Sequence, residues 1–174
     1  VLRFAGMGEP LIYRDIVDMI GYADKIAEKT ELITNASLLT PKMSDALISA
    51  GLSRMVVSIQ GTTAEKYKEV CGIDIDFKNF INNLKYFFDN KKNTKVYIKI
   101  LDYALEEEDW YIPHKFYKIF GDICDYIGIE HAVPIYPDVD YDRVLGDISF
   151  TQFGSPIFDV QICPRPFATM YIIA

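Results

Sequence analysis

The chain has 174 residues and a formal net charge of −7; half of its residues are hydrophobic and 14% are aromatic. This apolar content suffices for one well-packed domain and excludes a disordered chain. The acidic balance without a basic cluster argues against a nucleic-acid partner, and no apolar run is long enough to span a membrane. We therefore expect a cytoplasmic protein whose partner is a small molecule, a peptide or another protein.

The first predicted element is a short strand at Val1-Leu2 that leads into the loop Phe4–Pro10 (FAGMGEP). Glycine allows close approach of a ligand to the backbone, and proline fixes the following φ and removes a donor. Such a loop offers a carboxylate and bare backbone to a ligand above the strand. An ordinary strand-to-helix turn would show the same pattern.

Helices and strands then alternate. Thr40 caps a helix that has Pro41 at its first position and Gly51 after its end, and Thr62 with Glu65 predicts a capping box. The predicted strands after the first run over 32–34, 55–60, 96–101 and 127–133, and the helices over 14–29, 41–50, 62–70, 77–88 and 116–123.

This alternation predicts an α/β fold with a parallel sheet and right-handed crossovers, either a barrel or an open doubly wound sheet. In both folds, ligands bind beyond the carboxyl ends of the strands. Polar residues occupy those ends in the predicted sheet: Glu9, Asn35, Ser58, Gln60, Lys99, Asp102 and His131.

Lys99 is the least expected of these residues, because it carries a charge between Ile98 and Ile100 in a strand that should be buried. It is either a buried lysine paired with a neighbouring carboxylate or a ligand-binding group. Burying the hydroxyl of Ser58 costs less free energy than burying the charge of Lys99. Taken alone, Ser58 is explained as a structural hydroxyl whose hydrogen bonds are satisfied within the protein.

Four segments resemble the motifs of radical S-adenosylmethionine (radical SAM) enzymes. Gly6–Pro10 resembles their Gly-Gly-Glu-Pro motif, and Thr34–Ala36 is similar to their Thr-Asn-Gly segment, with alanine at the usual glycine. Ser58–Gly61 resembles Ser-Ile-Asp-Gly, and Tyr67–Gly72 is similar to Tyr-x-x-Ile-Arg-Gly, with Cys71 at the arginine position. Order and spacing agree over about 130 residues, which is more specific than any single motif.

The resemblance implies a TIM-barrel-like partial (β/α) barrel of six parallel strands, of which residues 1–133 would form strands two to six. The missing first strand would leave a sheet edge that is exposed or paired with a second copy of the chain. The open side of such a barrel receives the substrate.

The same resemblance implies S-adenosylmethionine as cofactor. The loop backbone around Gly8, Glu9 and Pro10 would hold its amino group, and Ser58 and Lys99 would face its carboxylate or ribose. Asn35 would help to line the cavity. Backbone near Val133 would meet the adenine.

Metal chemistry is implied by the resemblance as well. The [4Fe-4S] cluster of the family is held by Cys-x-x-x-Cys-x-x-Cys after the first strand, a spacing that Cys71, Cys124 and Cys163 do not have. The motif would lie upstream of Val1, so this chain alone is expected to be inactive.

The last segment, 134–174, is predicted to hold a connection followed by a cluster domain. Residues 134–156 are rich in proline, aspartate, tyrosine and glycine, which is typical of a covering connection. Cys163-Pro164-Arg165-Pro166-Phe167 resembles the opening of a SPASM or twitch extension, which would make Cys163 a ligand of an auxiliary cluster.

Three functions remain open from the sequence. The first is the core of a radical SAM iron-sulfur oxidoreductase or maturase that cleaves S-adenosylmethionine reductively to a 5'-deoxyadenosyl radical, with a peptide or protein among the candidate substrates. The second is a (β/α) lyase or isomerase in which Lys99 acts as base or Schiff-base former near Glu9. The third is a non-catalytic barrel module used for protein contact.

Overall fold

Five parallel strands form one sheet whose spatial order is the order of the sequence. The computed structural model describes residues 1–6, 8–105 and 114–131. Each strand pairs in parallel with the next one in the chain. The strands are β1 (Leu2–Phe4), β2 (Thr30–Thr34), β3 (Arg54–Ile59), β4 (Lys95–Leu101) and β5 (Tyr126–Glu130). The predicted α/β class with a parallel sheet is confirmed.

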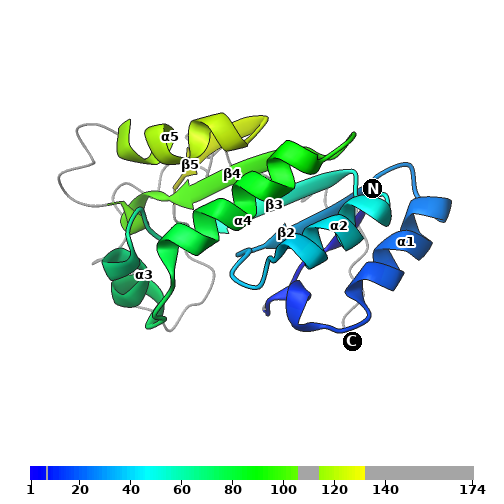
Figure 1. Cartoon of the computed structure of the whole chain (residues 1–174), viewed down its shortest axis with the longest axis horizontal. Coiled ribbons are helices and arrows are strands. Elements are labelled where there is room, and N and C mark those ends of the chain that lie inside the picture. The colour runs from blue at the N-terminus through cyan, green and yellow to red at the C-terminus, as the bar shows by residue number, and fades with distance from the viewer. Residues whose placement is uncertain (7, 106–113, 132–174) are drawn as a thin grey trace, which may run out of the picture.

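The helices that connect the strands cover one face of this sheet. Figure 1 shows α1 (Ile16–Ile26), α2 (Pro41–Ser49), α4 (Phe77–Asn90) and α5 (His114–Phe120) on the same face, and α3 (Ala64–Cys71) beyond the carboxyl ends of the strands. Three short 3-10 turns complete the described elements: η1 (Pro10–Ile12), η2 (Asp102–Ala104) and η3 (Gly121–Ile123). Within the described residues, no helix is both long and apolar enough for a membrane span.

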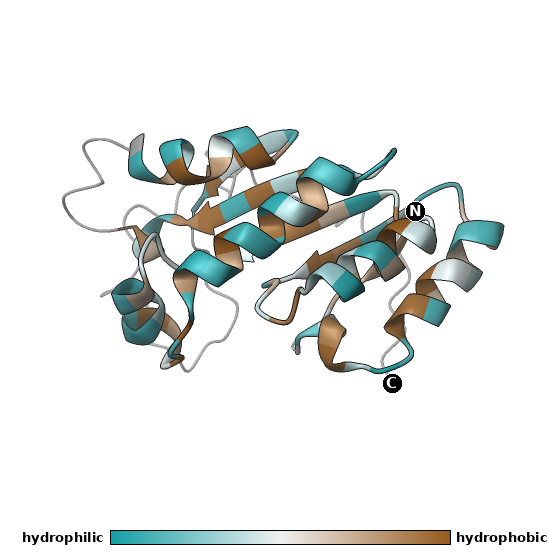
Figure 2. Ribbon diagram, in the orientation of Figure 1, coloured by the Kyte–Doolittle hydropathy of each residue, from teal (hydrophilic) through white to brown (hydrophobic). Residues whose placement is uncertain are grey.

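The main core lies between the sheet and its helix layer. Side chains along a strand alternate between the two faces, and the apolar set of each strand faces the helices. Figure 2 shows this apolar layer and the hydrophilic outer side of α4. The fully buried members include Leu32, Met55, Ile59, Ile98 and Ile100 from the strands and Ile20, Leu47, Leu84, Phe87, Phe116 and Phe120 from the helices.

The other face of the sheet, which we call the inner face, carries a different kind of side chain. It consists of Arg3, Glu31, Ile33, Arg54, Val56, Ser58, Lys95, Tyr97, Lys99, Leu101, Tyr126, Gly128 and Glu130, the alternate residues of the same strands. Nine of these thirteen residues carry a charged or hydroxyl group, in a sheet type whose strands are usually apolar on both faces. The inner face is therefore where polar chemistry is concentrated.

Helix boundaries follow most of the signals in the sequence. Thr40 Oγ1 accepts a hydrogen bond from the Met43 amide (3.2 Å), and Gly51 after the helix has a left-handed φ of 84°. The capping box at Thr62 is wrong by one residue, because Thr63 is the cap and its Oγ1 accepts from the Lys66 amide (3.1 Å). Thr62 itself is buried.

The helix predicted over 14–29 is shorter than expected at both ends. It spans Ile16–Ile26, because Ala27 is already extended and Thr30 belongs to β2. Met19 and Ile26, placed beside the apolar stripe by the helical spacing, are 46% and 65% exposed. β1 lies at the edge of the sheet and pairs with β2 only, among the described strands.

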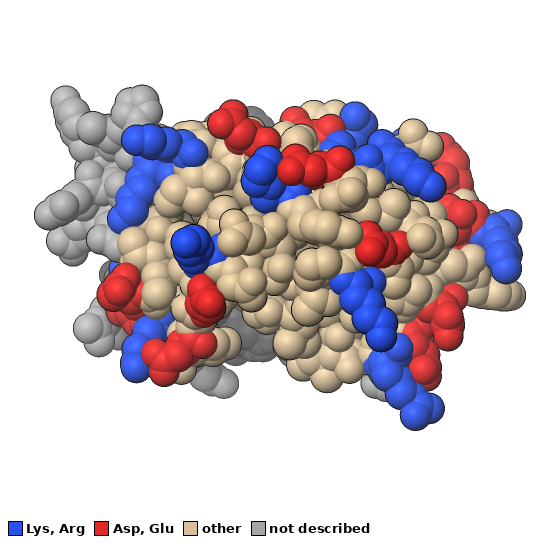
Figure 3. All heavy atoms as spheres, viewed as in Figure 1, with Lys and Arg blue, Asp and Glu red and all other residues tan. Residues whose placement is uncertain are grey.

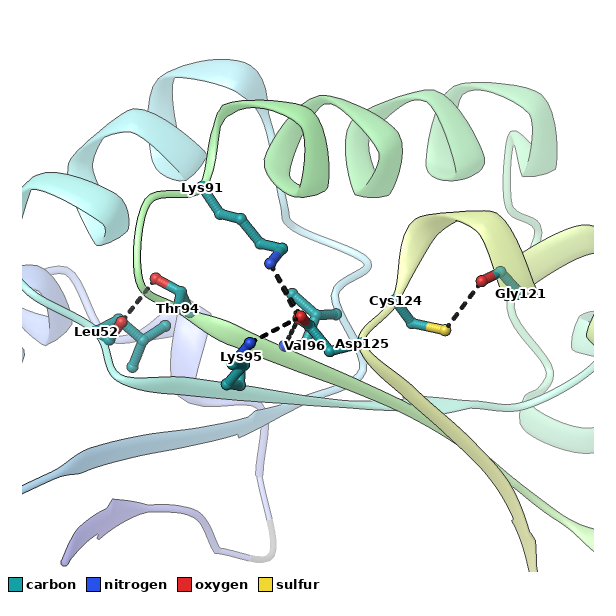
Figure 4. A network of polar contacts seen from close by, with 8 residues as sticks. All are labelled: Leu52, Lys91, Thr94, Lys95, Val96, Gly121, Cys124 and Asp125. Carbon is teal, nitrogen blue, oxygen red and sulfur yellow. Dashed lines mark hydrogen bonds and ion pairs between the residues drawn. The ribbon is translucent and has the colours of Figure 1, made fainter.

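The amino edge of the sheet is fixed by a cluster around Asp125 (Figure 4). The Val96 amide donates to its carboxylate (2.8 Å), and Lys91 (3.0 Å) and Lys95 (3.3 Å) form ion pairs with it. Burial alone would raise the pKa of Asp125, but these hydrogen bonds and charges outweigh it and lower the pKa below its ordinary value. This cluster joins β4 to the start of β5 at the edge opposite the polar strand ends.

Candidate functional site

Glu9 fastens the glycine loop to the end of β2. Its Oε1 accepts from the Leu11 amide (3.0 Å) and from Thr34 Oγ1 (2.6 Å), and its Oε2 accepts from the Asn35 amide (2.8 Å). Three donors thus bind one carboxylate, which is a strong arrangement because the acceptor is charged. The carboxylate holds the loop at the carboxyl edge of the sheet and is used by the protein itself.

The glycines of this loop have no structural explanation inside the described residues. Neither Gly6 nor Gly8 has a left-handed φ, and a Cβ built on either would have no atom of the described residues within 4 Å. By contrast, a Cβ on Gly61 would lie 2.8 Å from Lys66 Cβ, so packing alone requires that glycine. Open space above a fixed backbone is what a ligand that contacts main-chain atoms needs.

Asn35 and Ala36 form the turn after β2. Asn35 Oδ1 accepts from the Ser37 amide (2.9 Å), and the Ala36 amide donates to Thr34 Oγ1 (2.8 Å). Ala36 has a left-handed φ of 57°, the conformation that glycine adopts without cost. The alanine therefore stands where the backbone itself favours the glycine of the related motif.

Ser58 and Lys99 lie side by side on the inner face, as partners in the register of β3 and β4. Lys99 Nζ donates to Glu130 Oε2 at 2.7 Å, and the two side chains are 24% and 5% exposed. Of the two alternatives for Lys99, pairing with a carboxylate is what the protein shows. Glu130 was missed by the sequence reasoning, although it ends a strand in the same way as the residues that were selected.

Tyr97 completes this group from the same strand as Lys99. Its hydroxyl donates to Glu130 Oε1 (3.0 Å), and the burial of Tyr97 together with the charge of Glu130 raises its pKa to about 12. The tyrosine crosses over Gly128, where a Cβ would lie 3.0 Å from the hydroxyl. Arg54 lies over the ring of Tyr97, with its Cζ 5.5 Å from the centroid.

A second charged group occupies the amino half of the inner face. Glu31 is buried and accepts from Arg3 Nε and from Arg54 Nη1 (3.0 Å), which belong to the two neighbouring strands. Because Arg54 also contacts Tyr97, polar side chains connect all five strands across the inner face. Paired arginines satisfy the buried carboxylate and make this end of the face structural.

Asp102 and His131 also meet at the carboxyl edge. They follow β4 and β5, and Asp102 Oδ2 lies 2.9 Å from His131 Nδ1. Val133 and Cys163 lie outside the described residues, so their expected contacts with adenine and with an auxiliary cluster stay predictions.

The described residues contain no set of three or more His, Cys, Asp or Glu side chains that could hold a metal ion. Cys71 and Cys124 are free, and burial raises the pKa of both thiols, with nearby acidic residues adding to it for Cys124. A thiol that stays protonated is a poor iron ligand. The described residues therefore supply no ligand set for an iron-sulfur cluster.

The charges on the helix-covered face do not indicate a binding site. Figure 3 shows lysine and arginine interspersed there with aspartate and glutamate, without a large patch of one sign. Such a surface is typical of a solvated exterior. The carboxyl edge remains the candidate site.

Parallel (β/α) folds with polar strand ends of this kind define a class of enzymes that bind ligands at the carboxyl edge. A model of the radical SAM superfamily matches residues 4–110, more than half of the chain, and the chain belongs to this superfamily. Enzymes of this superfamily use S-adenosylmethionine and a [4Fe-4S] cluster.

Three similar proteins illustrate the relationship. The chain is 32% identical over 78 residues to an AdoMet-dependent heme synthase of Methanosarcina barkeri, which is 45% of the chain and 22% of that protein. It is 38% identical over 63 residues to a PqqA peptide cyclase of Rhodopseudomonas palustris, which is 36% of the chain and 16% of that protein. SuiB of Streptococcus suis bound to S-adenosylmethionine has the same fold, with a TM-score of 0.59 at 18% identity over 87% of this chain and 31% of SuiB. The matched stretches thus span about a fifth of the curated relatives, which are much longer proteins.

Proposed function

We propose that this chain supplies the S-adenosylmethionine-binding part of a radical SAM enzyme. The observation that carries the proposal is the set of three hydrogen bonds that the Glu9 carboxylate accepts from the protein itself. The backbone of Gly6 and Gly8, where a Cβ would meet no described residue within 4 Å, is then the part of the loop that a ligand at the carboxyl edge can contact. A main-chain turn of this kind can accept hydrogen bonds from the ammonium group of the ligand. The superfamily membership of the chain supports the choice of ligand.

The other polar strand ends would hold the rest of the ligand. Lys99 and Ser58 lie next to each other on the inner face and would donate to its carboxylate or ribose. Asn35 is held by its own turn beside Glu9 and would line the cavity wall. The residues of this chain bind and orient the nucleoside and restrict water around it.

A [4Fe-4S] cluster, when bound, supplies the electron that cleaves S-adenosylmethionine in this superfamily. Because the described residues offer no cluster ligands, we expect the 174-residue chain alone to release no 5'-deoxyadenosine. The full-length gene product, reconstituted with iron and sulfide and reduced, should release it. Absence of 5'-deoxyadenosine from the reconstituted full-length protein would contradict the proposal.

The substrate class is proposed from the relatives. One similar protein is a PqqA peptide cyclase, and one structural neighbour was crystallised with a precursor peptide. We favour a peptide or protein substrate at the open side of the barrel, and an auxiliary cluster for which Cys163 is the first ligand.

The lyase or isomerase alternative is weakened because it needs Lys99 and Glu9 to act together. Glu9 accepts hydrogen bonds from three donors and Lys99 is paired with Glu130, so the two side chains have different partners.

A further inference from the structure

Glu130 binds two side chains of one neighbouring strand at the same time. Its Oε1 accepts from the Tyr97 hydroxyl (3.0 Å) and its Oε2 accepts from Lys99 Nζ (2.7 Å). The carboxylate is 5% exposed, so neither bond is weakened much by solvent. The three side chains lie on the inner face, and the Lys99 side chain is the more exposed member of the charged pair.

We propose that Tyr97 and Glu130 are positioning residues that hold the Lys99 ammonium group in place for the nucleoside ligand. This inference rests on the proposed function, in which Lys99 contacts that ligand. A lysine side chain has four rotatable carbons and loses much freedom when it binds. A lysine that is already fixed by a carboxylate has less freedom left to lose, so the ligand binds more tightly.

Two features of the chain fit this positioning role of Tyr97 and Glu130. Tyr97 is a hydrogen-bond donor at physiological pH even with the ordinary tyrosine pKa of about 10, and burial with the adjacent carboxylate raises its pKa further, to about 12. Gly128 leaves the space that the tyrosine ring crosses, since a Cβ there would lie 3.0 Å from the hydroxyl. The glycine in the middle of β5 is explained by this crossing, because glycine otherwise weakens a strand.

The test uses a change that leaves every charge in place. Tyr97→Phe removes only the hydroxyl that fixes Glu130, so Lys99 keeps its charge partner but becomes less well fixed. Tyr126→Phe is the matched control, because Tyr126 is the register partner of Tyr97, faces the same side and is 58% exposed. Both changes are made in the unmodified chain and in the Lys99→Met background, and binding of S-adenosylhomocysteine is measured by calorimetry, with urea unfolding in parallel.

We expect Tyr97→Phe to raise the Kd for S-adenosylhomocysteine about 3- to 10-fold. Tyr126→Phe should leave the Kd unchanged, and Tyr97→Phe should have no further effect once Lys99 is methionine. Gly128→Ala, whose Cβ would lie 3.0 Å from the hydroxyl and push it aside by a few tenths of an ångström, should raise the Kd in the same direction as Tyr97→Phe. This second variant decides the question if Tyr97→Phe lowers the yield of folded protein.

Two results would overturn the inference. One is an unchanged Kd for Tyr97→Phe together with a lower free energy of unfolding, which would make the tyrosine purely structural. The other is an equal rise in Kd in the Lys99→Met background, which would show that Tyr97 acts without Lys99. Failure of the unmodified chain to bind S-adenosylhomocysteine is a different outcome, because it contradicts the proposed function itself.

Discussion

Thr34, the last residue of β2, donates a 2.6 Å hydrogen bond to Glu9, which lies 25 residues earlier in the loop after β1. The same carboxylate accepts from two backbone amides, one in its own loop and one after β2. These three hydrogen bonds hold Glu9 against the end of β2. Such preorganisation is what a ligand site at the carboxyl edge requires.

Replacing Glu9 should therefore affect stability and binding together. Glu9→Gln keeps the size of the side chain but removes the charge and one acceptor, and we expect a loss of about 2 kcal/mol in unfolding free energy. Urea unfolding measures it. The exposed Glu28 gives the control, since Glu28→Gln should change stability by less than about 0.5 kcal/mol. Equal effects of the two changes would contradict the role assigned to Glu9.

Ala36 should tolerate replacement by glycine unusually well. Ala36→Gly loses about 0.8 kcal/mol of methyl burial, and relief of the left-handed φ returns about 1 kcal/mol, so stability should stay within about 1 kcal/mol. Ala23, equally buried but inside α1, is the comparison. Ala23→Gly should cost about 1.5 to 2 kcal/mol through lost burial and lower helix propensity. A larger loss for Ala36→Gly than for Ala23→Gly would show that the left-handed turn is not strained.

Gly61 should not accept a side chain. A Cβ there would lie 2.8 Å from Lys66 Cβ and 3.1 Å from the Lys66 carbonyl carbon, so Gly61→Ala must shift α3. We expect a loss of about 1 to 3 kcal/mol in thermal or urea unfolding. Gly121→Ala should be nearly neutral, because none of the residues that the structure describes has an atom within 4 Å of the new Cβ.

Asp125 should make stability depend on pH in the acid range. Its pKa is lower in the folded protein than in the unfolded chain, so its contribution is complete above the ordinary pKa and is lost as pH falls through the folded value. The unfolding free energy of the unmodified chain should exceed that of Asp125→Asn above about pH 5, and the difference should shrink below about pH 4. Asp122→Asn, at an exposed neighbouring position, should leave the pH profile unchanged. A constant difference between the unmodified chain and Asp125→Asn down to pH 2 would contradict the assignment, as would an altered profile for Asp122→Asn.

The fold could be predicted because its signals are local. Thr40 with Pro41 and Gly51 fixes both ends of α2, and the one-residue error at Thr62 arose because two adjacent threonines precede Glu65. Alternation of strands and helices then allows few topologies. Which residues meet across neighbouring strands depends on the register of strand pairing, and local sequence signals do not determine that register.

In the candidate site, too, single residues could be selected from the sequence, but their partners could not. Lys99 could be selected because it interrupts an apolar strand, but its partner Glu130 is 31 residues away and is brought near by the pairing of β4 with β5. Tyr97 is an ordinary strand residue until Gly128 lets its ring reach that carboxylate. The use of the Glu9 carboxylate by the protein likewise follows from three-dimensional contacts, since the motif alone suggested a carboxylate offered to the ligand.

Binding of S-adenosylhomocysteine to the 174-residue chain, measured by isothermal titration calorimetry, tests the central claim most directly. We predict saturable binding with one site per chain, weakened about 10- to 100-fold by Lys99→Met and unchanged by the same substitution at the exposed Lys78 of α4. Absence of binding, or equal affinity in the unmodified chain and the Lys99→Met variant, would contradict a nucleoside site at the carboxyl edge of this sheet.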